Sequence, residues 1–203
     1  MPAANKRTKP KSKARIMHKK PSCTIIFGIT CELTSLRAID QLKKLLSRIK
    51  KNHADDFDKI CTTVKFIKKV SKEDIEKTGE LGSWVENEST VYFRQTLKNP
   101  DRILTTFAHE FGHVCATDDD IEDRKAPHPE WASEAAADMY VAKWGYLKMA
   151  LRVWKKYQRN QDHHGPLPGE TCEYEGMGAE AEIFSTVYLV DKNFIYHSTP
   201  PKK

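Results

Sequence analysis

The stretch FAHEFGHVC, residues 107–115, contains two histidines four positions apart, with a glutamate directly after the first. Asn99 and Pro100 stand where a helix cap and a first helical residue are expected, so a helix is predicted through the stretch. Its hydrophobic residues recur at helical spacing: Ile103, Leu104, Phe107, Phe111 and Val114. Side chains four residues apart lie on one helix face, so His109 and His113 can point at one ion.

This HExxH pattern predicts a zinc site. Imidazole nitrogens are common zinc ligands, which assigns His109 and His113 to the metal. Glu110 follows the first ligand and can reach a water on the metal rather than the metal itself. Zinc lowers the pKa of such a water, and a neighbouring carboxylate takes its proton. The sequence therefore predicts Zn²⁺ as cofactor and Glu110 as general base.

A zinc site that performs chemistry needs a third protein ligand and an open position. Glu134 is the best candidate, because it follows His113 by 21 residues and lies on the next predicted helix. Asp138 is one turn further on and is placed to accept a hydrogen bond from a ligand imidazole. Asp119 is an alternative ligand, but it needs a sharp turn, and Ala116 stands where glycine normally serves that turn.

The group that would stabilise an oxyanion is left open by the sequence. Histidines outside the motif are also weaker candidates for the metal, since lone histidines are more often surface residues, and one of them or a tyrosine could stabilise the oxyanion. These histidines and tyrosines are His128, His163, His164, His197, Tyr174 and Tyr188.

The two motifs, HEFGH at residues 109–113 and EAAAD at residues 134–138, resemble those of the gluzincin branch of zinc metallopeptidases. The resemblance covers roughly residues 80–145, about a third of the chain. It implies an α+β, zincin-like domain with a small mixed sheet, an active-site helix carrying HExxH and a following ligand helix. It also implies a peptidase with zinc on His109, His113 and Glu134.

The resemblance further implies how a polypeptide substrate binds. In that family the substrate lies extended along an edge strand just before the metal helix, and residues 90–97 occupy that place here. An extended peptide could add to such a strand by main-chain hydrogen bonds. The expected contacts are Thr90, Val91, Tyr92 and Phe93.

The rest of the chain predicts a β-α-β start, a hairpin and further helices. The predicted elements are a strand at residues 23–30, an amphipathic helix capped by Thr34 or Ser35 and ending near Asn52, a strand at residues 60–70, a hairpin of residues 84–85 and 90–97 around a turn at residues 86–89, a charged loop at residues 118–125, and a helix from about Glu130 with a break at Gly145. Residues 181–197 fit a helix or a hairpin around residues 191–193. The sequence leaves open whether residues 160–203 cover the cleft as a lid or as a propeptide-like plug.

The 203-residue chain divides into a basic tail, residues 1–20, and one domain, residues 21–203. The tail holds eight lysines and arginines and no acid, which leaves 26 basic against 28 acidic residues in the domain. Such a tail is expected to be disordered and to serve as a nuclear-localisation signal or a nucleic-acid-binding arm, or only as a solvated terminus. Five widely spaced cysteines predict reduced thiols in a cytoplasmic or nuclear protein, and no apolar run is long enough for a membrane span.

Two alternative functions remain. The tail could recruit the protease to nucleic acid, where lysine contacts to phosphate give affinity without sequence specificity. The chain could also be a non-catalytic scaffold stabilised by zinc. Against the scaffold stands Glu110, because a structural zinc site has no use for a base.

Overall fold

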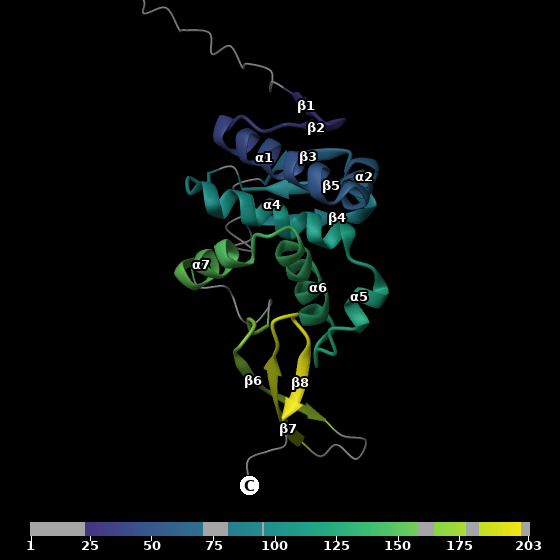
Figure 1. The fold of residues 1–203 in the computed structure, drawn as a ribbon, viewed down its shortest axis with the longest axis vertical. Helices are drawn as coiled ribbons and strands as arrows, with labels where there is room; N and C mark the ends of the chain where they lie inside the picture. The colour runs from purple at the N-terminus through teal and green to yellow at the C-terminus, as the bar shows by residue number, and fades with distance from the viewer. Residues whose placement is uncertain (1–22, 71–80, 95, 158–164, 178–182, 200–203) are drawn as a thin grey trace, which may run out of the picture.

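The computed structural model describes residues 23–70, 81–94, 96–157, 165–177 and 183–199. Its larger sheet is five-stranded and mixed, with the strand order β1-β2-β3-β5-β4 (Figure 1). The strands are β1 (Thr24–Ile26), β2 (Ile29–Cys31), β3 (Phe66–Lys69), β4 (Gly82–Val85) and β5 (Thr90–Phe93). A sheet with helices packed against it confirms the α+β class.

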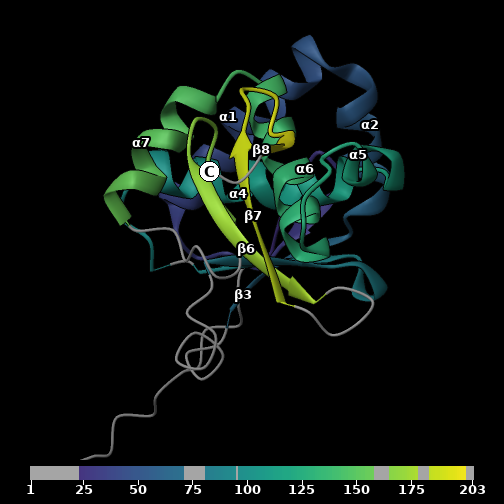
Figure 2. The ribbon, with the colours of Figure 1, turned by 90° about the horizontal axis from the view of Figure 1, so that it is seen from below.

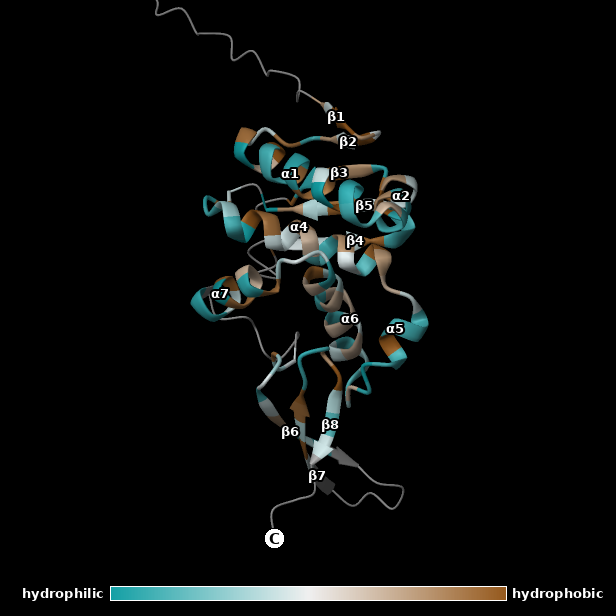
Figure 3. Ribbon diagram, viewed as in Figure 1, coloured by the Kyte–Doolittle hydropathy of each residue, from teal (hydrophilic) through white to brown (hydrophobic). Residues whose placement is uncertain are grey.

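Seven helical segments are described. They are α1 (Leu36–Asn52), α2 (Ala54–Thr63), η1 (Glu86–Glu88), α4 (Pro100–Cys115), α5 (Asp118–Glu122), α6 (Pro129–Lys143) and α7 (Leu147–Tyr157). Ser35 caps α1 as predicted, accepting a hydrogen bond from the backbone N–H of Ala38 at 3.3 Å. Hydrophobic and hydrophilic stretches alternate along α1 (Figure 3), and its buried side with Leu42, Leu45 and Leu46 faces the core.

Helices α1, α2 and α4 lie to one side of the five-stranded sheet (Figure 2). The alternation of side chains along β5 fits this arrangement, because Val91 and Phe93 are fully buried whereas Tyr92 between them is partly exposed. Burying each large aliphatic or aromatic side chain of this core contributes roughly 1.5–3 kcal/mol. The core therefore holds α4 firmly against the sheet.

Two of the early strand predictions are wrong. Residues 23–30 form a hairpin rather than one strand, because Phe27 and Gly28 both adopt positive φ, 50° and 87°, and reverse the chain between β1 and β2. The first part of the predicted strand at residues 60–70 belongs to α2, which ends at Thr63, and only Phe66–Lys69 is strand. The predicted β-α-β start is confirmed, since β2 and β3 pair in parallel.

The predicted hairpin before the metal helix is confirmed. Strands β4 and β5 pair antiparallel, and η1 fills the turn between them. Ser89 closes that turn in the left-handed region, with φ of 49°. β5 also pairs in parallel with β3, so β4 and not β5 forms the edge of the sheet.

The charged segment at residues 118–125 is not only a loop, because its first residues form the short helix α5. Thr117 and Asp120 make a reciprocal capping box that satisfies the start of α5. The helix predicted from Glu130 is α6, and it ends before Gly145 as predicted. Gly145 has a φ of 81°, a conformation that favours glycine.

The C-terminal part is a three-stranded antiparallel sheet at the end of the molecule opposite β1 and β2 (Figure 1). Its strands are β6 (Thr171–Met177), β7 (Ile183–Val190) and β8 (Tyr196–Thr199). The hairpin alternative for residues 181–197 is therefore correct. A second buried cluster packs Ala135 of α6 against the C-terminal sheet. Its other members are Val190 of β7, Phe194 in the turn between β7 and β8, and Tyr196 of β8.

Two negative findings concern the described part of the chain. None of its helices has both the length and the apolar character to cross a membrane. All five cysteines lie within it, and none of them forms a disulfide.

Candidate metal centre

Local interactions fix how α4 presents its histidines. The Asn99 side chain caps the helix, accepting hydrogen bonds from two first-turn N–H groups at 2.9 and 3.2 Å. The ring of Phe107 stacks on Phe93 of β5 with centroids 4.2 Å apart, which anchors one side of α4 on the sheet. His109 and His113 then point away from the sheet toward α6, and both are partly exposed.

Helices α4 and α6 approach each other closely at Gly112. A Cβ at this position would lie 2.4 Å from the backbone oxygen of Ala137 and 2.9 Å from its carbonyl carbon. Only glycine fits such a contact without moving a backbone. The sequence prediction missed the requirement for Gly112. A glycine in the middle of a predicted helix was the available signal.

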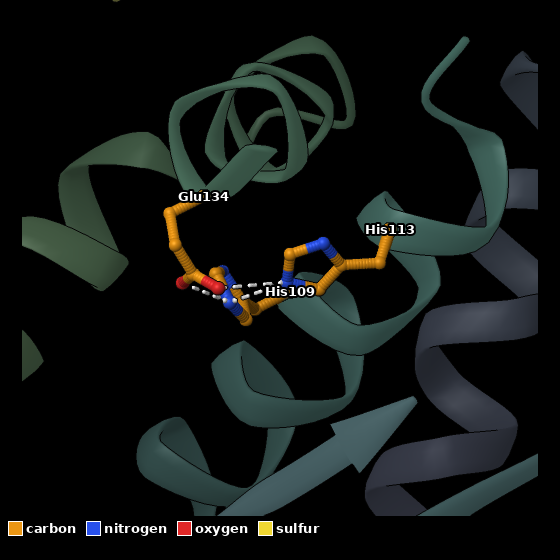
Figure 4. A group of neighbouring side chains, drawn as sticks. All are labelled: His109, His113 and Glu134. Carbon is orange, nitrogen blue, oxygen red and sulfur yellow. Dashed lines mark hydrogen bonds and ion pairs between the residues drawn. The ribbon is translucent and has the colours of Figure 1, made fainter. Parts of the chain in front are cut away.

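Glu134 reaches from α6 to the two imidazoles (Figure 4). Its Oε2 lies 3.0 Å from His109 Nε2, and its Oε1 lies 3.3 Å from His113 Nε2. The two Nε2 atoms are 3.2 Å apart, with the rings nearly perpendicular at 88°. These three residues form a group whose ligand atoms all lie within 4.8 Å of one another, so they could hold a metal ion.

The distances fit a tetrahedral ion. Zinc–nitrogen and zinc–oxygen bonds of about 2.0–2.1 Å at tetrahedral angles put neighbouring ligand atoms roughly 3.3–3.4 Å apart. The two Nε2 atoms, 3.2 Å apart, and the pair of His109 Nε2 and Glu134 Oε2, 3.0 Å apart, need to widen by only a few tenths of an ångström. Glu134 approaches His113 through its other oxygen, Oε1, at 3.3 Å. Two imidazoles and one carboxylate are also a donor set that suits zinc. The residues present therefore fit the expected metal.

Asp138 orients the first histidine. It is almost fully buried, and its Oδ1 lies 2.8 Å from Nδ1 of His109. An Nδ1–H donated to this carboxylate leaves the Nε2 lone pair of the neutral imidazole directed at Glu134 and His113. The predicted place of Asp138 beside a ligand imidazole agrees with this geometry.

The electrostatics of the group favour a cation. Burial lowers the pKa of His109, but the carboxylates of Glu134 and Asp138 raise it by more, so the pKa lies well above its ordinary value. The two carboxylates stabilise a proton on this imidazole despite the cost of burying its positive charge. They would stabilise a divalent cation for the same electrostatic reason. Protons and metal would compete for the site.

Glu110 lies beside the group but outside it. The residue is 6% exposed, and its carboxylate touches the edge strand at Gly82. A Cβ at Gly82 would lie 2.7 Å from Glu110 Oε1 and 2.9 Å from the Thr106 methyl carbon. Gly82 therefore leaves the space that the carboxylate occupies. Nothing in the sequence pattern predicted this contact of Gly82.

Asp119, the alternative ligand, is not among the converging residues. It is exposed on α5, whose start the capping box of Thr117 and Asp120 turns away from α4. The sharp turn that would return Asp119 to the histidines does not form. Glu134 is the carboxylate that the structure brings to them.

The residues considered for oxyanion stabilisation have other contacts where the structure describes them. The Nδ1 atom of His128 accepts a hydrogen bond from the first turn of α6 at 3.3 Å, and His197 lies 3.0 Å from Asp191. Tyr174 packs edge-on against Trp131, 6.5 Å between centroids. None of these contacts assigns an oxyanion role. His163, His164 and the basic tail at residues 1–20 lie outside the described residues.

The expected substrate strand needs a correction. Thr90, Val91, Tyr92 and Phe93 form β5, which already pairs with β3 on one side and β4 on the other. A peptide cannot add to a strand whose main chain is paired on both sides. The position given to residues 90–97 at the sheet edge belongs to β4 instead.

Comparison of the chain with protein families, with curated proteins and with solved structures finds no match. The likeness to zinc metallopeptidases therefore rests on the two motifs and on the geometry of their side chains.

Proposed function

We propose that the chain is a zinc-dependent peptidase that hydrolyses peptide bonds with Glu110 as general base. The observation that carries this proposal is the convergence of His109, His113 and Glu134 beside a buried glutamate at the sheet edge. Three protein donors leave one position of a tetrahedral ion open, which is typical of catalytic zinc sites, whereas structural sites are closed by four protein ligands.

The metal and the residues around it have distinct tasks in this mechanism. Zinc, when bound, polarises the scissile carbonyl and acidifies the attacking water. Asp138 holds the His109 ring in the orientation and tautomer that binding requires. Glu110 accepts the proton of the attacking water and passes it to the leaving amine, so one carboxylate serves as base and then as acid.

The edge strand β4 is the proposed docking site for the substrate. Its pairing partner among the described strands is β5, and its other edge carries main-chain groups that an extended peptide can bind. Gly82 of this strand touches Glu110, so a peptide added to β4 would lie beside the base. This geometry supports a polypeptide substrate.

Substitution of Glu110 by glutamine tests the proposal. Zinc-loaded wild-type protein and Glu110→Gln are compared on a library of fluorescence-quenched peptides, with Glu122→Gln, an exposed glutamate on α5, as the matched control. We expect Glu110→Gln to keep one zinc per chain and to lose turnover by about 10²- to 10⁴-fold, the usual contribution of a general base. Glu122→Gln should behave like wild type.

Two results would contradict the peptidase. Equal turnover of Glu110→Gln and wild type would reject Glu110 as the general base. Bound zinc without cleavage of any peptide in the library would favour the scaffold alternative.

A further inference from the structure

A cavity of about 270 Å³ lies at the start of α4, away from the metal ligands. Its lining residues are Arg94, Thr96, Leu97, Lys98, Asn99 and Arg102. We name it the basic pocket, because three of these six side chains are cationic.

Two of the three cations of the basic pocket, Arg94 and Lys98, carry charges that no described carboxylate pairs with. Among the described residues, neither Arg94 nor Lys98 forms an ion pair with a carboxylate, and Arg94 Nε instead donates to the Thr96 hydroxyl at 3.3 Å. The acid in the first turn of α4, Asp101, faces Arg152 at 3.9 Å. The pocket therefore suits an anionic group.

The backbone at the helix start is not what would bind this anion. The Asn99 side chain already accepts hydrogen bonds from the N–H groups of Asp101 and Arg102. Recognition would fall to the guanidinium and ammonium groups, and guanidinium groups pair with carboxylates through two parallel hydrogen bonds.

The basic pocket shares a helix face with the metal ligands. Arg102 precedes His109 by seven residues, which on an α-helix corresponds to about 10 Å along the axis and about 20° in direction. Thr106 lies between them on the same face, under Gly82 of the edge strand. Residues of the basic pocket and of the metal group thus lie along one line of α4.

The edge strand β4 lies near both the basic pocket and Glu110. The backbone N–H of Arg94 donates to the Leu81 carbonyl at 2.9 Å, directly before β4 begins. Gly82, the next residue, touches Glu110. A peptide laid along β4 would therefore run between the basic pocket and the base. About three extended residues, at roughly 3.3 Å each, span the 10 Å between Arg102 and His109.

We propose that the basic pocket binds a carboxylate of the peptide substrate, about three residues from the scissile bond. This inference rests on the proposed peptidase function and adds a substrate class to it. The carboxylate is either the C-terminus of the substrate or an aspartate or glutamate side chain. The pocket then selects peptides that have their C-terminal carboxylate, or an acidic side chain, at this distance from the scissile bond.

A binding experiment separates this inference from catalysis. Fluorescently labelled peptides long enough to span the zinc site are titrated into full-length Glu110→Gln protein loaded with zinc. Fluorescence anisotropy then gives the dissociation constant of each peptide. Three peptides differ only in one group: a free C-terminus, an amidated C-terminus, and an amidated peptide with glutamate three residues from the expected scissile bond. A single-stranded oligonucleotide is tested in parallel.

We expect the free-carboxylate or the glutamate peptide to bind about 10-fold or more tightly than the neutral peptide, as charge-assisted hydrogen bonds allow. The preferred peptide identifies the source of the carboxylate. Arg94→Gln and the exposed Lys98→Gln should each reduce this preference, while Arg152→Gln, a nearby cation outside the pocket, should not. Circular-dichroism melting curves verify that the variants fold.

The outcomes are distinguishable. Carboxylate-dependent binding without cleavage by wild type would support the pocket and reject the peptidase. Equal binding of acidic and neutral peptides would overturn the pocket, even if wild type cleaves both. Oligonucleotide binding that Lys98→Gln and Arg94→Gln abolish, without any peptide preference, would also overturn it and assign the charges to nucleic acid.

Discussion

Replacing Gly112 by alanine tests whether the helix contact sets the ligand geometry. The new Cβ would lie 2.4 Å from the Ala137 oxygen, whereas real Cβ contacts essentially never fall below 3.0 Å and are ordinary from 3.4 Å. Helices α4 and α6 must therefore separate locally by 0.6 to 1.0 Å. Because Ala137 precedes Asp138 and follows Glu134 by three residues, both carboxylates move away from the histidines.

The expected effect is larger on zinc binding than on stability. Forcing a methyl group into a packed contact costs about 1–3 kcal/mol, and alanine regains about 1 kcal/mol of helix propensity. The net loss of unfolding free energy is then about 0–2 kcal/mol. Displacing the partners of ligand histidines typically lowers metal affinity about 10- to 100-fold. We expect Gly112→Ala to bind zinc at least about 10-fold more weakly.

Competition with a chromophoric chelator measures the zinc dissociation constant, and thermal melting of the metal-free protein measures stability. Ser47→Ala, on the exposed side of α1, is the control for helix propensity alone. Gly112→Ser should be worse than Gly112→Ala. If Gly112→Ala binds zinc within twofold of wild type, the close approach of the helices is not what fixes the site.

Three further predictions concern the same residues and their surroundings. Gly82→Ala should retain zinc but lose peptide hydrolysis, since its Cβ would meet the Glu110 carboxylate at 2.7 Å; a fully active variant would contradict this role. Asp138→Asn should weaken zinc binding about 10- to 100-fold in the chelator assay, because it removes the charge behind the ligand imidazole; unchanged affinity would reject that contribution. Burial raises the pKa of Asp120, but hydrogen bonds from the backbone and side chain of Thr117 lower it by more, so the net pKa is lowered. A lowered folded-state pKa gives stability that is present above the unfolded pKa of about 3.9 and is lost as the pH falls through the folded value. Thermal melts of Asp120→Asn and wild type should therefore differ at neutral pH and converge below about pH 4; a difference that persists at low pH would mean that the charge of Asp120 is irrelevant.

The sequence predicted those features of the site that depend on a single helix, or on the spacing between two consecutive helices. The four-residue spacing on α4 places His109 and His113 on the same helix face. A carboxylate on the next helix was then the best candidate for a third ligand. The choice between Glu134 and Asp119 also followed from the lack of glycine at Ala116. These features are local, so they could be derived without the rest of the fold.

The errors have a common physical origin in strand order and turns. Residues 23–30 looked like one β-branched strand, and only the positive φ of Phe27 and Gly28 divides it. The edge position was assigned to Thr90–Phe93, but pairing partners depend on contacts distant in sequence, and β3 takes the other side of β5. The glycine contacts at positions 82 and 112 are tertiary, so local patterns could not identify their partners, although a glycine within the predicted helix marked position 112 as unusual.

The most direct test of the central claim is the zinc content of the purified full-length protein by elemental analysis, after dialysis against zinc and then against metal-free buffer. We predict one zinc per chain for wild type and for Glu110→Gln, and almost none for a variant in which His109 and His113 are both alanine. Wild type without zinc, or a double variant that retains zinc at the wild-type ratio, would contradict the metal centre described above.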